Sequence, residues 1–438
     1  MRASLAILAL LPAFAAGQPA DLIDLARQAP PEFFADAVIK LVEAGKAADA
    51  AQRRSLLIEA FDAAKHSQER VRLVAIPGLP SDSRAGLRDA AAMLGLDAYS
   101  LEGRIAALLA QTDADKARDL FLNVEPPDLQ PRPCEDPMIA DASSYYEMAA
   151  SVAVQDLIPV LGGANSPGEL ASFAKVLGKS TSVPSDELRL LIGVLALKMP
   201  MIPADYRSFT RTADELRQGL EGVAARAREL DIPMQPLAEG VRKMTIVQLG
   251  SPRCNEDFGD SAAFVQWFNS SFRGRLDPLT RDETENLDYG RGFAKAESYF
   301  ASGTAKGIAD KFQKLRAIRG SAGWRDGLTE FLRDFDRWNP SGADIDAFHQ
   351  RMTVLHGLYQ LTPPSDDRDK VIHRAIDVFK SSQVERHYPS EWMLQVRSFA
   401  SAAPDSRAGL LDAFRVSDDP GLRLLAAIQL SYGTNVTQ

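Results

Sequence analysis

The chain has 438 residues, of which 45% are hydrophobic and 25% are charged, and its formal net charge is −9. This length is too great for one ordinary hydrophobic core, and the hydrophobic fraction excludes a chain that is disordered throughout. Acidic and basic residues are interspersed and no basic face stands out, so we expect no nucleic-acid partner.

The first 17 residues have the composition of a secretory signal peptide. Arg2 follows the amino terminus, an apolar run extends from Ala3 to Leu11, and small residues follow in the sequence AFAAG. The apolar run is too short to anchor the chain in a membrane. We therefore predict export, with cleavage after about Ala15 to Gly17. The mature protein is expected to be soluble, secreted or periplasmic, and without a transmembrane segment.

Helical periodicity dominates the rest of the chain. In segment 31–49, PEFFADAVIKLVEAGKAAD, apolar residues form one stripe at helical spacing, and Asp36, Lys40 and Glu43 lie off that stripe. The same arrangement recurs in segments 55–66, 101–111 and 114–124. The later apolar run LLIGVLAL at 190–197 is long enough only for a buried helix.

Proline-containing breaks separate the predicted helices at 77–83, 125–133, 232–236 and 361–367. Alternating β-branched runs bounded by hairpin turns are missing. We therefore predict an all-α fold of helix–turn–helix pairs, stacked as an α-solenoid-like array. This array is similar to tetratricopeptide and HEAT solenoids in architecture only. The echo between DSRAGLRDA at 82–90 and DSRAGLLDA at 405–413 fits such pairs, with chance similarity as the alternative.

Aromatic residues are unevenly distributed, because 22 of the 33 lie after Cys254, including all four tryptophans. The helices after that point therefore bury larger side chains or line a groove. Together with the proline-rich break, this contrast predicts three regions after the signal peptide at 1–17. They are an N-terminal helical-repeat region at 18–125, a middle helical region at 126–250 and an aromatic-rich C-terminal helical region at 251–438.

The two cysteines, Cys134 and Cys254, lie in similar contexts, RPCEDP and PRCNEDF. The ligand spacing of a structural zinc site and the CxxC spacing of a thioredoxin-like couple are both missing. Two cysteines in an exported protein most simply pair, so we predict a Cys134–Cys254 disulfide. Each cysteine is expected in a loop just ahead of a helix. Reactive thiols and a calcium site at the adjacent acidic pairs are the alternatives.

Sequence signals for catalysis are mostly negative. The GxSxG, HExxH and GxxxxGK[ST] motifs do not occur, nor does GxGxxG before a helix. His349 and His356 share a helix face, but two turns separate them, which is too far for one metal without other ligands. We therefore predict no metal and no cofactor.

One segment, AESYFASGTAKGIADKF at 296–312, resembles the Glu-Ser motif of lytic transglycosylases. That family is exported and carries a catalytic glutamate on a helical domain behind an α-solenoid. The resemblance covers this segment alone and keeps only the glycine spacing of the run that follows the motif. It implies that Glu297 is a general acid with Ser298 as its neighbour. Such chemistry requires a glutamate enclosed in an apolar pocket. A surface acid is the alternative.

Two functions follow from these observations. The preferred hypothesis is an exported helical-repeat protein without chemistry of its own, acting as a protein-binding or scaffolding module. Its partner would be another protein or a peptide on a concave helical surface. The alternative is a cell-envelope enzyme that cleaves glycan and uses Glu297.

Overall fold

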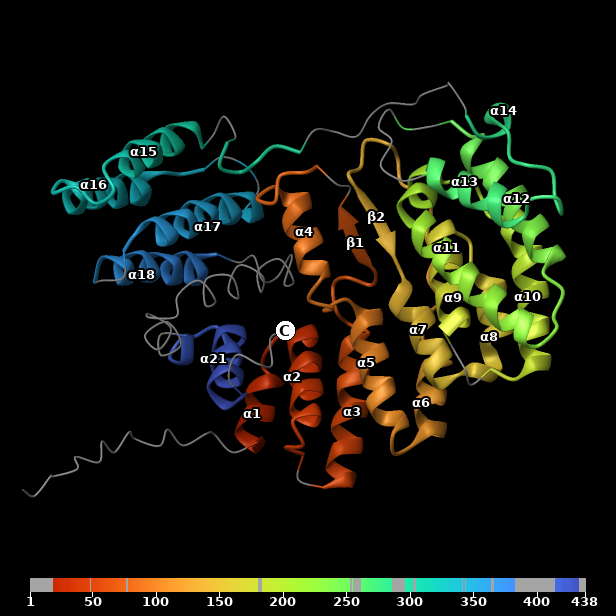
Figure 1. The fold of residues 1–438 in the computed structure, drawn as a ribbon. Coiled ribbons are helices and arrows are strands. Elements are labelled where there is room, and N and C mark those ends of the chain that lie inside the picture. Colours follow the sequence, from red (N-terminus) through yellow and green to blue (C-terminus); the bar gives the residue numbers. More distant parts are fainter. Residues whose placement is uncertain are drawn as a thin grey trace, which may run out of the picture.

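The computed structural model describes residues 19–47, 49–75, 78–179, 183–252, 254, 261–285, 296–301, 305–340, 342, 344–363, 366–382 and 414–432. The described chain is mostly helical, which confirms the predicted all-α class (Figure 1). Stacking as a solenoid stays a prediction. The predicted signal peptide and the second copy of the echo at 405–413 lie outside the described residues.

Helices of the first half alternate with short connections. Their bounds are α1 Pro19–Ala26, α2 Pro31–Glu43, α3 Ala50–Ala64, α4 Arg84–Ala92, α5 Ala98–Ala110, α6 Ala114–Phe121, α7 Ser143–Val152, α8 Leu157–Gly163, α9 Pro167–Lys179, α10 Ser185–Lys198, α11 Tyr206–Glu229 and α12 Gln235–Leu249. Short 3₁₀ turns, η1 Val154–Asp156 and η2 Met199–Met201, precede α8 and follow α10. The later helices are α13 Ser261–Ser271, α14 Arg281–Thr284, α15 Lys306–Ala317, α16 Trp324–Arg337, α17 Asp344–Leu361, α18 Asp366–Ser381 and α21 Pro420–Tyr432.

Side-chain caps explain where several of these helices begin. A carboxylate or hydroxyl just before the helix accepts a hydrogen bond from the backbone N–H three residues later, which satisfies one of the free donors of the first turn. The capping residues are Asp49, Ser83, Asp97, Asp113 and Asp205. The proline-rich segment 125–133 forms no helix, as predicted, and separates α6 from the strand that follows.

Alternate helices of the first half form a packed series. Helix α3 packs on α5, α5 on α7, α7 on α9 and α9 on α11, while α10 packs on α8 and α12 beside the series (Figure 1). A continuous hydrophobic core extends from Leu22 in α1 to Ile428 in α21. The predicted division at about 125 and 250 stays a prediction. None of the described helices is long and apolar enough to cross a membrane.

Two short strands interrupt the helical pattern. Strand β1 (Arg72–Ala75) pairs antiparallel with β2 (Met138–Asp141), with Arg72 opposite Asp141 and Ala75 opposite Met138. The Arg72 guanidinium and the Asp141 carboxylate form an ion pair of 3.0 Å across this ribbon. The ribbon lies between α4 and the block of helices that contains α7 and α11 (Figure 1).

Helix α2 is covered on more sides than its sequence predicts. It packs against α1, α3 and α5, so its polar side also lacks contact with solvent. Asp36 and Lys40, predicted to lie off the apolar stripe, are buried and form an ion pair of 2.6 Å. Arg104 of α5 also contacts Asp36 at 3.2 Å. A buried carboxylate needs such partners because burial without them carries a large desolvation cost.

Helices α9 and α11 pack backbone against backbone. A Cβ atom at Gly219 would lie 2.5 Å from the backbone nitrogen of Lys175, and one at Gly178 would lie 2.8 Å from the carbonyl oxygen of Gly219. Gly222 in turn faces the backbone of Gly178. Glycine at these positions therefore lets the two helix axes approach more closely than side chains would allow.

The two cysteines that the sequence predicts to pair lie at disulfide distance, with 2.00 Å between their Sγ atoms and 5.4 Å between their Cα atoms. The predicted setting of Cys134 is wrong, because strand β2 and not a helix follows it. The reason is local. The carboxylate of Asp136 accepts hydrogen bonds from the backbone N–H of Met138 at 3.0 Å and from Arg132, which turns the chain into the strand.

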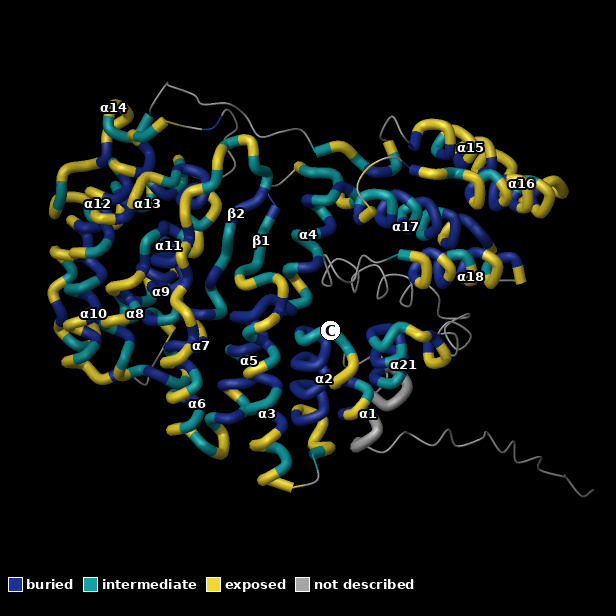
Figure 2. Tube along the Cα trace, turned by 180° about the vertical axis from the view of Figure 1, so that it is seen from behind, coloured by how far each residue is buried: buried dark blue, intermediate teal, exposed yellow. Residues whose placement is uncertain are grey.

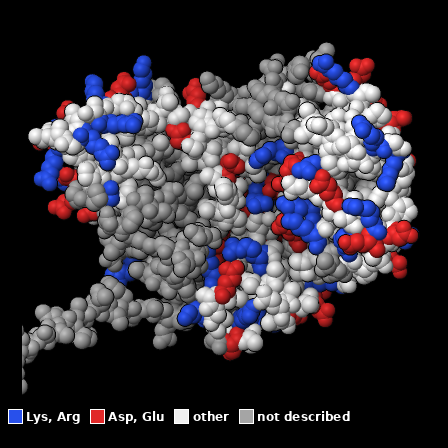
Figure 3. Space-filling model, viewed as in Figure 1, with Lys and Arg blue, Asp and Glu red and all other residues white. Residues whose placement is uncertain are grey.

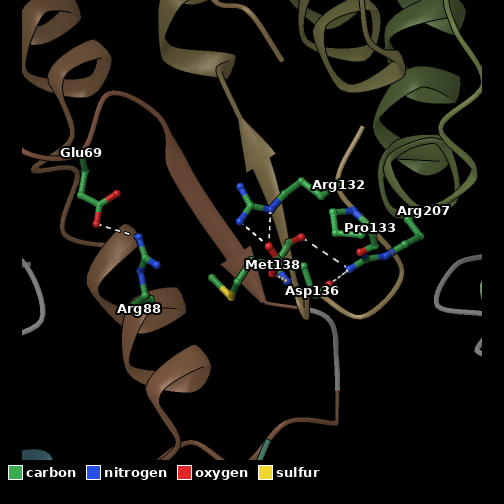
Figure 4. Close-up of polar contacts among 7 residues, drawn as sticks. All are labelled: Glu69, Arg88, Arg132, Pro133, Asp136, Met138 and Arg207. Atoms are coloured by element: carbon green, nitrogen blue, oxygen red, sulfur yellow. Dashed lines mark hydrogen bonds and ion pairs between the residues drawn. The ribbon is translucent and has the colours of Figure 1, made fainter. Parts of the chain in front are cut away.

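A buried arginine fastens this turn to α11. Arg207 is only 5% exposed, and its guanidinium donates to the carbonyl oxygens of Pro133 at 2.6 Å and Met138 at 3.4 Å, and to that of Asp136 (Figure 4). An isolated buried charge would be costly, and carbonyl dipoles converging on it offset that cost. The segment around Cys134 is therefore held by both a covalent bond and a charged hydrogen-bonding centre.

The close contact between α9 and α11 predicts a pair of opposite effects. Gly219→Ala places a methyl group against the backbone of α9 and should lower the free energy of unfolding by about 1–3 kcal/mol. Gly193→Ala, in α10, meets nothing within 4 Å and should raise it by about 0.5–1 kcal/mol. Urea denaturation followed by circular dichroism measures both. Equal effects of the two variants would contradict the backbone contact.

The disulfide encloses a long loop, since 120 positions separate the two cysteines. The chain-entropy treatment then gives a stabilisation of about 4–5 kcal/mol, most of which acts by restricting the unfolded chain. The double variant Cys134→Ser, Cys254→Ser should lose stability of that order in urea denaturation. Wild-type protein unfolded with reductant should match the variant, and an unchanged midpoint in both would show that the bond contributes nothing.

Candidate binding groove

A groove of about 740 Å³ lies between α12, α13 and α14, whereas the pockets beside β1 and β2 measure only about 20 and 10 Å³. Its volume is within the range of sites that bind small molecules or peptide side chains. The groove is lined by Leu249 of α12, by Ser261, Ala262, Val265, Gln266, Asn269, Ser270 and Arg273 along and after α13, and by Arg281, Thr284 and Glu285 at α14.

Helix α13 forms the floor of the groove. One of its sides is aromatic and buried, and the opposite side lines the groove. One side carries Phe264 and Phe268, which are buried, and the ring of Phe264 lies 5.3 Å from that of Phe209 in α11. The opposite side repeats every four residues and combines small, apolar and amide side chains. The buried side anchors the helix, so the mixed side is presented on a fixed element.

Hydrogen bonds hold the opposite wall of the groove. The side chain of Asn269 exchanges two hydrogen bonds with the backbone of Leu279, at 2.7 and 3.0 Å. Arg242 of α12 donates to both carboxylate oxygens of Glu283, at 2.8 and 3.0 Å. The backbone N–H of Thr280 and this guanidinium hold the pKa of Glu283 below its ordinary value. The segment that leads into α14 is thus fixed to both neighbouring helices.

The charged side chains of the groove are not equivalent. Arg281 is paired with Glu285, one turn later in the chain. Arg273 is exposed and forms no ion pair with a described residue. Near it lie the amides of Gln266 and Asn269, with the side chain of Val265 one turn back on the same side of α13. The lining therefore offers one uncompensated cation, several hydrogen-bonding groups and a small apolar surface.

The residue that the transglycosylase resemblance points to lies elsewhere. Glu297 is exposed, belongs to a non-helical stretch and does not line the groove. Its neighbour Ser298 donates a hydrogen bond to the carboxylate of Asp82, which also accepts one from the backbone N–H of Phe300 at 3.3 Å. The described surroundings of Glu297 thus lack the apolar enclosure that a glutamate acting as general acid requires.

The two histidines considered as metal ligands have other contacts. His349 is fully buried, and its Nδ1 lies 3.3 Å from the hydroxyl of Tyr299, which itself donates to Asp346 at 2.9 Å. Burial lowers the pKa of His349 to about 3, so this ring is neutral at physiological pH. His356 lies 2.8 Å from the side-chain amide of Gln360. Within the described ranges, no three histidine, cysteine or acidic side chains are placed to hold a metal.

A set of buried acids near the start of α2 and α5 was not predicted from the sequence. Glu32, Asp97 and Glu102 are all buried, and burial raises their pKa values to about 7, about 6 and about 7. The negative charge of Glu69 adds to the effect on Glu32, while Lys65 opposes it at Glu102. Glu32 lies in the first turn of α2 and Asp97 caps α5, where an acid is ordinarily assigned to the helix end, so both look like surface residues in the sequence.

No known family model matches this chain, and no curated protein or solved structure matches it. The described lining combines a cation, amide and hydroxyl groups and a small apolar surface, all of which can contact a ligand.

The buried acids predict a stability that falls as pH rises. A raised carboxyl pKa means that the folded state keeps protons that the unfolded chain releases above about pH 4. The contribution is therefore complete at low pH and is lost as pH rises towards about 7, by about 1.4 kcal/mol for each unit of pKa shift. Glu32→Gln removes one such group.

Urea midpoints at pH 4.5 and pH 8 test this prediction. We expect Glu32→Gln to be at least as stable as wild type at pH 8 and to have a flatter pH dependence. Glu147→Gln, on an exposed position of α7, serves as the matched control and should follow the wild-type profile. Parallel profiles for wild type and Glu32→Gln would show that Glu32 keeps its ordinary pKa.

Proposed function

We propose that this protein is an exported binding module whose α12–α13–α14 groove holds an extended peptide segment of another protein. The observation that carries the proposal is the groove itself, with its volume of about 740 Å³ and its mixed lining on an anchored helix. A groove fixed in place before binding loses little entropy when its ligand arrives.

The lining also indicates the chemistry of the segment. Arg273 has no counter-ion among the described residues, so an acidic side chain or a terminal carboxylate would pair with it. Val265 and Leu249 offer contact to a small apolar side chain. The amide of Gln266 suits peptide groups, because an extended peptide presents unpaired N–H and C=O groups along its length.

Export is the second part of the proposal. It is supported by the composition of the first 17 residues and by the cysteine pair, since disulfides persist in oxidising compartments and are rare in the cytosol. Charges of both signs lie side by side over the described part of the face seen in Figure 3. A glycan-cleaving role for Glu297 gains no supporting observation, because the side chain is exposed.

Peptide display tests the groove directly. Random twelve-residue peptides on phage are selected on immobilised wild-type protein, and the enriched sequences are synthesised and measured by fluorescence polarisation. We expect acidic residues among them. Val265→Trp fills the groove and should weaken their binding at least tenfold, which corresponds to about 1.4 kcal/mol. When the same selection is carried out on the Arg273→Glu variant, the enriched peptides should no longer contain the acidic residues.

Val416→Trp is the matched control, since Val416 is 71% exposed and lies outside the groove. It should bind the same peptides as wild type, and all variants should keep the wild-type melting temperature. Peptides that bind Val265→Trp as tightly as wild type would place the binding surface elsewhere and overturn the groove assignment.

A further inference from the structure

Helix α10 carries an apolar stripe that faces away from the core. Leu190, Leu197 and Met201 are 59%, 72% and 72% exposed, and they are three of the five most exposed large apolar side chains in the described chain. Val247 of the neighbouring α12 is also exposed. The prediction of a wholly buried helix at 190–197 is therefore wrong for these leucines. Both views place α10 at the edge of the molecule (Figure 1 and Figure 2).

The stripe has the geometry of a helix contact. At about 100° and 1.5 Å per residue, Leu190 and Leu197 of α10 lie within about 20° of one another and about 10 Å apart along the axis, and Met201 follows in the 3₁₀ turn η2. Gly193 lies midway, and a Cβ atom there would meet nothing within 4 Å. The position without a side chain would let another helix approach closely at the centre of the stripe.

Charges beside the stripe make it complementary to itself. Glu187 and Lys198 lie on the same side of it, near opposite ends of α10. Lys198 donates to the carbonyl oxygen of Gly162 at 2.8 Å, and neither residue forms an ion pair with a described residue. In an antiparallel pair of α10 helices, Leu190 faces Leu197 of the second copy, and Glu187 comes beside Lys198 of the second copy. The two-fold axis then passes beside Gly193. The helix dipoles are also antiparallel, which is the favourable orientation.

We propose that α10 is the contact between two copies of this chain, packed antiparallel about Gly193. The contact is isologous, so the same stripe serves both copies and closes the pair. A contact made by one helix and the turn after it buries less surface than the standard interface of about 800 Å² per partner, so the dimer is weak and forms at micromolar or higher concentration. This inference is independent of the groove, which lies on other helices.

Sedimentation velocity over a concentration series measures the association. Wild-type protein should shift from monomer to dimer as its concentration rises. Leu197→Asp should weaken the dimer at least tenfold and leave the melting temperature unchanged, because the side chain is exposed. Val416→Asp, at an equally exposed site outside α10, should associate like wild type. A wild-type protein that stays monomeric at several hundred micromolar would overturn the proposal.

A single introduced cysteine tests the register, because Cys134 and Cys254 are already paired. Gly193→Cys places a thiol beside the two-fold axis, where it can meet its own copy, and should give a crosslinked dimer on mild oxidation. Gly307→Cys is the matched control, another helical glycine with no atom near its Cβ position, and should remain monomeric. Equal crosslinking at both sites would indicate random collision and would overturn the antiparallel contact.

Discussion

The arrangement around the groove depends on the hydrogen bonds that the buried guanidinium of Arg207 donates to three backbone carbonyl oxygens. Arg207 lies in the first turn of α11 and gathers the carbonyl oxygens of Pro133, Asp136 and Met138 around one buried charge. These carbonyls belong to the segment that contains Cys134, and the disulfide continues the connection to Cys254, just before α13. The floor of the groove is therefore tied to α11 through a hydrogen-bonded centre and a covalent bond in series.

Helix α11, to which the floor of the groove is tied, is itself held rigidly by tight packing against its neighbours. Helix α11 has its glycines directly against the backbone of α9, and the aromatic side of α13 packs on α11. Close-packed elements of this kind have few alternative arrangements, so a side chain mounted on them keeps its position. Arg242 and Asn269 then fix the wall that faces α13. Stability and the shape of the candidate site thus come from the same contacts.

Local signals in the sequence account for much of the fold. Helical periodicity and proline-containing breaks indicate the helices of the first half. The cysteine pairing follows from the predicted export of the chain and from its having only two cysteines. The strands were not predictable in the same way, because each has four residues and the two partners lie far apart in the chain. Only tertiary contacts create such a ribbon.

The groove, like the β1–β2 ribbon, depends on contacts between distant segments that the sequence alone does not reveal. The apolar pattern of α13 predicts a helix, but the groove exists only because residues after Leu279 fold back against it. Likewise, the sequence predicts that the polar side of α2 contacts solvent, whereas in the structure α1, α3 and α5 cover it. The run at 190–197 shows the reverse, since an apolar segment is expected to be buried and its outer leucines are not. In each case the neighbour that decides burial lies elsewhere in the sequence.

The chain also closes on itself, because α1 packs against α21 and Arg423 donates to the side chain of Gln28 at 3.2 Å. These two residues are 395 positions apart. At about 5–20 residues per second, a ribosome needs about 20–80 s to make the intervening chain. During that time the side of α1 that will contact α21 has no partner. Helix α21 is therefore needed to complete the burial of α1, and the synthesis of α21 sets the earliest moment at which this part of the core can form.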